Sequence, residues 1–109
     1  MDKQSVYKTE LEKWRGLFVD TPDATKRGAD GLIEKAAYLH SLCHELEGVI
    51  ALSGAIKIHP QHPELQKQVP AVKEYARLAE SYANLANKLN SILAKNVLDE
   101  DEDDLEEFE

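Results

Sequence analysis

The stretch PAVKEYARLAESYANLANKLNSI, residues 70–92, decides the fold class. Its large apolar residues recur at alternating steps of three and four, which is the spacing of one face of an α-helix. They are Tyr75, Leu78, Tyr82, Leu85, Leu89 and Ile92. Pro70 favours a helix start, because the first helical position has no use for a backbone N–H. The pattern predicts a long helix over about residues 70–95.

A row of small residues runs beside this apolar face. Its members are Val72, Ala76, Ala79, Ala83 and Ala86. Small side chains let a neighbouring helix approach closely, so the long helix is predicted to have two packing faces. One partner helix covers only one of them, and a chain of 109 residues has a modest core. The second face therefore predicts self-association.

Two further helical patterns precede the long helix. Residues 5–18 carry one apolar stripe, and residues 32–52 carry a wider one that ends at Gly54. Between them, the segment from Asp23 to Asp30 fits a continuous helix, a separate short helix or a loop, because two glycines weaken its helix propensity.

Residues 55–69 separate the last two helices. Three prolines in or next to this segment disfavour a helix there, and no apolar alternation typical of a strand is present. We therefore predict a long connection without strands. The whole pattern predicts an all-α fold in which a short N-terminal helix packs on a long antiparallel helical hairpin, as a single domain over residues 1–98.

The net charge of -8 comes from the end of the chain. Nine of the 21 acidic residues lie in residues 99–109, so residues 1–98 hold 12 acidic against 13 basic residues. We expect the acidic tail to be disordered, because its like charges repel one another. Leu105 and Phe108 are candidate anchors for a basic partner protein, and the alternative is a tail that only improves solubility. A near-neutral body leaves nucleic-acid binding possible.

Several site classes find no support in the sequence. There is no phosphate-binding loop and no nucleophile in a catalytic motif, so we expect no enzyme activity and no cofactor. The single cysteine, Cys43, excludes an internal disulfide. Neither a membrane span nor a signal pattern is present, so we expect a cytoplasmic protein. His40 and His44 lie four residues apart and leave a metal site as an alternative, although the pattern favours no metal.

Basic residues gather on the first helix and at the start of the second. Lys8, Lys13 and Arg15 belong to the first group, and Lys26 and Arg27 to the second. Such a surface can contact phosphates, and several copies in one assembly would add avidity. The alternative is that these residues form the solvated faces of amphipathic helices.

The order of short sequence signals over residues 7–109 resembles the small subunit of tailed-phage terminases, in the short helical-hairpin type found in phages and prophages. The signals are Leu11-Glu12-Lys13-Trp14, Ala37-Tyr38-Leu39, Gly54, a polar connector with Lys57 and His59-Pro60, Pro70-Ala71-Val72-Lys73, and Glu107-Phe108 at an acidic end. A full helix-turn-helix ahead of the hairpin is not evident in this chain.

The resemblance implies a non-enzymatic DNA-packaging component in the host cytoplasm. Such proteins assemble into rings, bind double-stranded viral DNA, and recruit and regulate the large terminase subunit. It implies ring contacts through Val72, Ala76, Ala79 and Ala83, a DNA-facing surface with Lys8, Lys13, Arg15, Lys26 and Arg27, and a large-subunit contact through Leu105 and Phe108. The competing hypothesis is a helical-hairpin interaction module, such as an adaptor, an antitoxin-like partner or an acidic inhibitor, that never binds DNA. A third hypothesis is an enzyme with a metal centre at His40 and His44.

Overall fold

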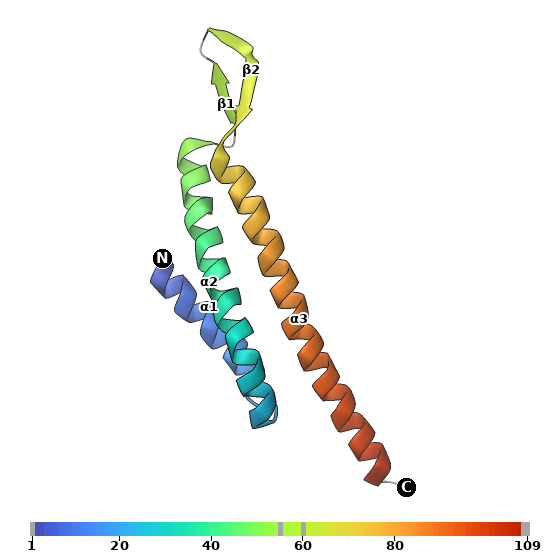
Figure 1. Cartoon of the computed structure of the whole chain (residues 1–109). Coiled ribbons are helices and arrows are strands. Elements are labelled where there is room, and N and C mark those ends of the chain that lie inside the picture. Colours follow the sequence, from blue (N-terminus) through green and yellow to red (C-terminus); the bar gives the residue numbers. More distant parts are fainter. Residues whose placement is uncertain (1, 55, 60, 108–109) are drawn as a thin grey trace.

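A computed structural model describes the backbone of residues 2–54, 56–59 and 61–107 (Figure 1). Side chains are described in these ranges except at 57, 59, 63, 65, 66 and beyond 97. The elements in chain order are α1 (Lys3–Leu17), α2 (Asp23–Ser53), β1 (Ile56–His59), β2 (His62–Gln68) and α3 (Pro70–Glu107). The predicted all-α class, with a short N-terminal helix and a long antiparallel helical hairpin, is confirmed.

Side-chain hydrogen bonds mark both ends of helix α1. The Asp2 carboxylate accepts a hydrogen bond from the Ser5 backbone N–H at 2.7 Å, which caps the first turn. At the other end the Thr21 hydroxyl donates to the Phe18 carbonyl at 2.7 Å and closes the turn into α2. The helix buries Val6, Glu10 and Trp14.

Helix α2 is continuous from Asp23 to Ser53, which resolves the three alternatives for residues 23–30 in favour of helix. Packing explains the outcome, because Ala29 and Ile33 are both 1% exposed in the core and outweigh the poor helix propensity of the neighbouring glycines. Gly54 ends the helix with a φ of 80°, a conformation that favours glycine.

The prediction that residues 55–69 contain no strands was wrong. Strands β1 and β2 form an antiparallel hairpin at the far end of the helical hairpin (Figure 1). Apolar and polar residues alternate only in Ile56-Lys57-Ile58, and this stretch was too short to stand out against the prolines. Pro63 lies in β2, where a sheet of two strands leaves one edge of that strand free of ladder hydrogen bonds.

Helix α3 is longer than predicted. Its backbone is helical to Glu107, whereas the sequence predicted an end near residue 95 and a disordered tail from 99. No glycine or proline follows Pro70, so the sequence offers no local signal that stops the helix. No helix in the described part of the chain is long and apolar enough to cross a membrane.

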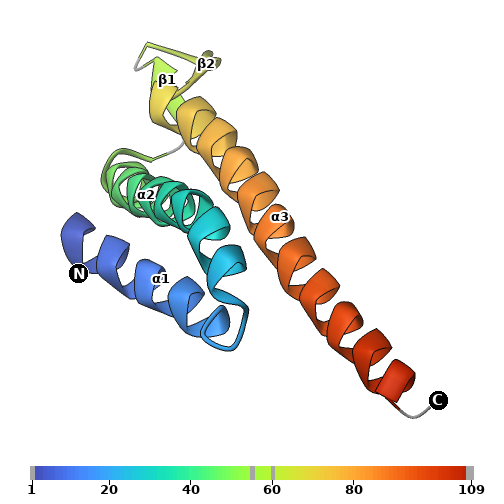
Figure 2. The same ribbon diagram turned by 60° about the horizontal axis from the view of Figure 1, so that its bottom comes forward.

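The core lies where three helices overlap. Trp14 from α1 and Phe18, the residue after α1, meet Ile33 and Ala36 from α2 and Leu89 from α3, all at most 4% exposed. The predicted apolar face of α3 is confirmed here, with Tyr82, Leu85 and Ile92 packed against the cluster. Beyond the start of α1, α2 and α3 continue as a pair toward the β-hairpin (Figures 1 and 2). The molecule measures 77 × 27 × 17 Å.

Candidate functional site

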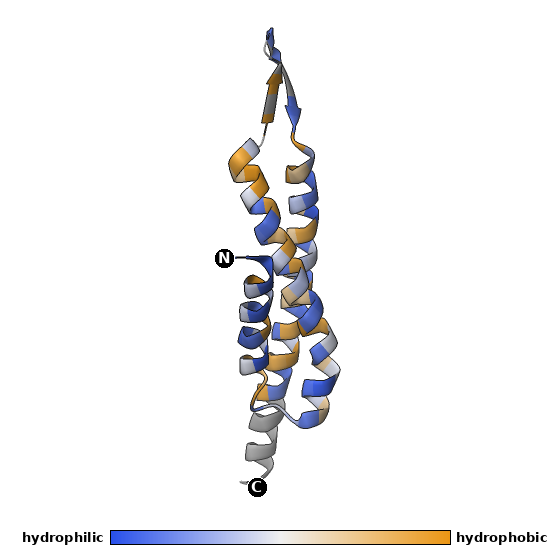
Figure 3. Cartoon of the chain, turned by 90° about the vertical axis from the view of Figure 1, so that its left-hand side faces the viewer, coloured by the Kyte–Doolittle hydropathy of each residue, from blue (hydrophilic) through white to orange (hydrophobic). Residues whose placement is uncertain are grey.

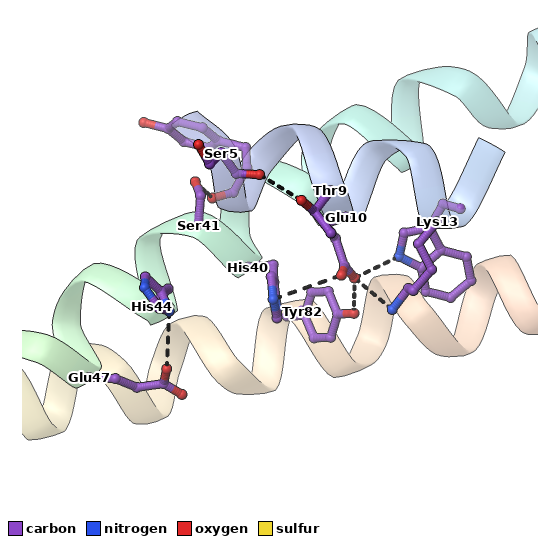
Figure 4. A network of polar contacts seen from close by, with 11 residues as sticks. Ser5, Thr9, Glu10, Lys13, His40, Ser41, His44, Glu47 and Tyr82 are labelled. Atoms are coloured by element: carbon purple, nitrogen blue, oxygen red, sulfur yellow. Dashed lines mark hydrogen bonds and ion pairs between the residues drawn. The ribbon is translucent and has the colours of Figure 1, made fainter. Parts of the chain in front are cut away.

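The most connected polar group in the described residues is Glu10, a carboxylate buried between the three helices (Figure 4). It accepts hydrogen bonds from the Trp14 indole N–H at 2.9 Å and from the Tyr82 hydroxyl. The Lys13 ammonium lies 2.9 Å away, and the His40 Nε2 atom lies 3.8 Å away. The cluster therefore joins residues of α1, α2 and α3 around one charge.

Opposing effects act on the Glu10 carboxyl. Burial raises its pKa, but the hydrogen bonds from Tyr82 and Lys13 and the nearby His40 outweigh burial and leave the pKa lowered. Burial and the Glu10 hydrogen bond together raise the pKa of the Tyr82 hydroxyl. For Lys13, burial lowers the pKa, and the contact with Glu10 outweighs it and leaves the pKa raised. Groups of the protein itself thus keep the Glu10 carboxylate ionised, and its contacts join the three helices.

The sequence reasoning missed Glu10, although a signal was available. Val6, Glu10 and Trp14 follow one another at steps of four, so Glu10 lies on the buried stripe of α1. A charged residue on an apolar stripe is seldom buried without partners. Lys13 and Trp14 lie within about one helical turn of Glu10, and its other two partners are 30 and 72 positions away in the sequence.

The two histidines of the metal hypothesis contact different acidic residues. His40 faces Glu10 and its ring lies 5.4 Å from the Tyr82 ring, centroid to centroid. His44 lies 3.9 Å from Glu47. The described residues contain no group of three or more metal-ligating side chains. Cys43, between the two histidines, is buried, and burial raises the pKa of its thiol.

Three of the five predicted DNA-facing cations form ion pairs within the chain. Lys13 joins the Glu10 cluster and lies 5.0 Å above the Trp14 ring. The Arg15 guanidinium binds the Asp30 carboxylate through two contacts at 3.0 and 3.1 Å. Lys26 lies 3.9 Å from Asp23 in the first turn of α2. The Arg15 pair links α1 to α2, whereas the Lys13 and Lys26 pairs each lie within one turn of their own helix.

The remaining two cations, Lys8 on α1 and Arg27 on α2, are exposed. The structure brings Arg15 and Lys26 together, because both line a surface cavity of about 250 Å³ at the turn between α1 and α2. The predicted basic surface is therefore divided: Arg15 and Lys26 line one cavity, whereas the exposed Lys13 pairs with the buried Glu10.

The predicted interface residues of α3 differ in exposure. Ala76 and Ala83 are exposed and lie seven residues apart, two turns along one side of the helix, whereas Val72 and Ala79 are half-buried. The small face predicted from the sequence is thus partly covered within the chain, and Ala76 and Ala83 are its open part. Of the predicted tail contacts, the Leu105 side chain and all of Phe108 lie outside the described residues.

An apolar surface at the β-hairpin end was not predicted. Val49 and Leu52 in the last turns of α2 are 45% and 93% exposed, and Ile56 and Ile58 in β1 are 55% and 57% exposed. We call these four residues the distal apolar surface. Large apolar groups that gather on one surface typically mark a contact with another protein.

Comparison with known proteins identified no relative of this chain. No protein-family model, curated protein or solved structure matches this chain.

Proposed function

We propose that this chain is a non-enzymatic subunit of a homo-oligomeric assembly. The observation that carries the proposal is the large surface that a single copy leaves exposed. A compact monomer of 12.3 kDa exposes about 6,100 Å², whereas this chain exposes 8016 Å². The radius of gyration is 20.0 Å, against about 13 Å for a compact domain of this length.

The excess surface is of the size that an interface buries. It amounts to about 1,900 Å² per chain, and a stable interface removes about 800 Å² from each partner. Part of the excess belongs to α3 where it extends beyond the other helices (Figure 1). Two further parts of the molecule contribute exposed surface: the β-hairpin, and α2 and α3 beyond α1, where no third helix packs on them (Figure 1).

Helix α3 offers a contact for neighbouring copies. The exposed Ala76 and Ala83 allow a second helix to approach closely, and the half-buried Val72 and Ala79 widen the contact. We propose that these four residues form the helical interface of the assembly, which closes into a ring if neighbouring copies pack head to tail.

In its most specific form, the proposal is a small-terminase-like DNA-packaging component that binds double-stranded viral DNA and recruits and regulates the large terminase subunit. The sequence resemblance supports this form. Lys8 and Arg27 are the cations best placed to contact phosphates, since no acidic side chain competes for them in the contacts described. The tail, with Leu105 and Phe108, is proposed to bind the large subunit.

A second candidate is an interaction module that oligomerises and binds proteins but never DNA. The internal ion pairs of Lys13, Arg15 and Lys26 favour it, because cations already paired with carboxylates contribute less to phosphate binding. Both candidate functions include the homo-oligomeric assembly, but only the first includes binding to DNA.

Two measurements test the proposal. Sedimentation velocity over a hundredfold range of concentration should detect a species larger than one chain, and a monomer throughout would overturn the assembly. Fluorescence anisotropy with a duplex DNA should then show binding that weakens steeply with salt. Binding that is absent at low salt would remove the DNA-packaging form and leave the interaction module.

A further inference from the structure

We propose that β1 pairs edge to edge with β1 of a second copy, forming a four-stranded sheet across a twofold axis. This inference rests on the proposed assembly but adds an interface separate from α3. In the described part of the chain, the β-hairpin projects beyond the helices. Its two strands pair with each other, and neither packs extensively on a helix (Figure 1).

A hairpin of two strands is marginally stable in water unless more strands or a packed face support it. Here the apolar residues that could supply a packed face point to solvent. Ile56 and Ile58 share one face of β1, and both are more than half exposed. Leu52, in the last turn of α2, is 93% exposed, and the ribbon is coloured as hydrophobic both at this end of α2 and in β1 (Figure 3).

The two outer edges of the hairpin differ. Strand β2 contains Pro63, which has no N–H to donate, and three residues of β2 oppose none of β1 between the pairs Ile58–Gln66 and His59–His62. Prolines and bulges are the features that protect an edge from further pairing. The unmatched residues all belong to β2, and β1 contains no proline, so we take β1 as the open edge.

A second copy of the chain fits this edge best. Antiparallel pairing of β1 with itself is isologous, so one strand supplies both sides of the contact. A register centred on Ile58 puts the two Ile58 side chains opposite each other and keeps Ile56 of both copies on the same face of the sheet. The surface excess of each chain is large enough for this contact as well as the one on α3.

This pairing predicts the shape of the dimer. Because β1 runs along the long axis of the molecule, antiparallel pairing places the helices of the two copies at opposite ends of the four-stranded sheet (Figures 1 and 3). The dimer is then a rod approaching twice the 77 Å length of one chain. Packing through α3 alone places the helices of neighbouring copies side by side and gives a shorter particle.

The test compares Ile58→Thr with Val19→Thr. Threonine keeps the strand preference of the site but removes apolar surface. Val19 is a matched control because it is 60% exposed and lies in the turn after α1, at the other end of the molecule. We expect Ile58→Thr to lower the sedimenting mass of the wild-type assembly by a factor of two or weaken its association at least tenfold, and Val19→Thr to change neither. Circular dichroism checks that both variants keep the wild-type helix content.

Covalent trapping tests the register. In a Cys43→Ala background, Ile58→Cys should form a disulfide-linked dimer on oxidation with copper phenanthroline, since directly paired Cα atoms lie within disulfide range. Val19→Cys should stay monomeric on the denaturing gel. Small-angle scattering of the linked dimer should give the long rod.

Failure of this inference differs from failure of the assembly. If Ile58→Thr leaves the oligomer intact, no Ile58→Cys dimer forms, and Ala83→Glu disrupts the oligomer, then β1 pairing is wrong and the α3 interface stands. If wild-type protein is monomeric at every concentration, the proposed assembly itself is wrong.

Discussion

The Tyr82 hydroxyl donates a hydrogen bond to the Glu10 carboxylate and joins α3 to α1 across 72 positions of the chain. Both groups lie in the region where the three helices meet, next to the core residue Trp14. Helix α1 is short and contacts mainly α2, so this hydrogen bond is a specific link between the first and the last helix.

Replacing Tyr82 with phenylalanine should destabilise the protein by about 1–3 kcal/mol, the usual cost of leaving a buried charged group short of a hydrogen-bond donor. Tyr75→Phe is the matched control, because the Tyr75 hydroxyl donates to Glu47 at 2.9 Å at an exposed site where water can replace it. Thermal unfolding followed by circular dichroism measures both. Equal effects of the two variants would contradict a special role for the buried link.

Glu10 should make the protein less stable in acid. Its pKa is lower in the folded state than in the unfolded chain, so the carboxylate contributes stability above the unfolded pKa of about 4.5. That contribution is lost as the pH falls through the lower, folded pKa. Urea unfolding of wild type and Glu10→Gln between pH 7 and pH 3 should show a difference in unfolding free energy that shrinks as the pH falls. Glu12→Gln, on the exposed side of α1, should leave the pH dependence of the wild type unchanged.

The helices could be predicted because each has a long apolar stripe that repeats over several turns. The helix over residues 23–30 could not, since the burial of Ala29 depends on a core cluster that includes Phe18, just after α1, and Leu89 from α3. The β-hairpin was missed because β1 has only four residues, too few for a periodic signal.

The candidate sites were less predictable than the fold. Charge and helical position identified Lys13 and Arg15 as exposed cations, and sequence spacing alone does not reveal that Arg15 meets Asp30, 15 positions away. Glu10 needed the same three-dimensional information, because two of its partners come from α2 and α3. Local periodicity predicts which face of a helix is buried but not which polar groups meet there.

If the protein binds DNA, replacing a cation without an ion pair should change the salt dependence of binding more than replacing a cation that already forms an ion pair. Arg27→Gln removes an exposed charge that meets no carboxylate in the described contacts, and should reduce both the affinity and the slope of log affinity against log salt, by about 0.9 for one phosphate contact. Arg15→Gln should change the slope less, because Arg15 is already bound to Asp30. Anisotropy titrations from 50 to 200 mM salt measure both slopes. A larger effect of Arg15→Gln would mean that the ion pair opens on DNA and that the cavity shared by Arg15 and Lys26 is the phosphate site.

Deleting residues 99–109 should shorten α3 without weakening the core. The last α3 residues packed against the core cluster are Ile92 and Leu93, and Val97 is already 55% exposed. The deleted segment also brings nine acidic residues to the C-terminal end of a helix, where negative charge opposes the helix dipole. We therefore expect an unchanged or slightly higher unfolding temperature, together with a helical circular dichroism signal reduced in proportion to the residues removed. A drop of several degrees would instead mean that the acidic segment packs on the protein. In the same truncated chain, an unchanged ability to stimulate the ATPase of a large terminase subunit would reject the proposed role of Leu105 and Phe108.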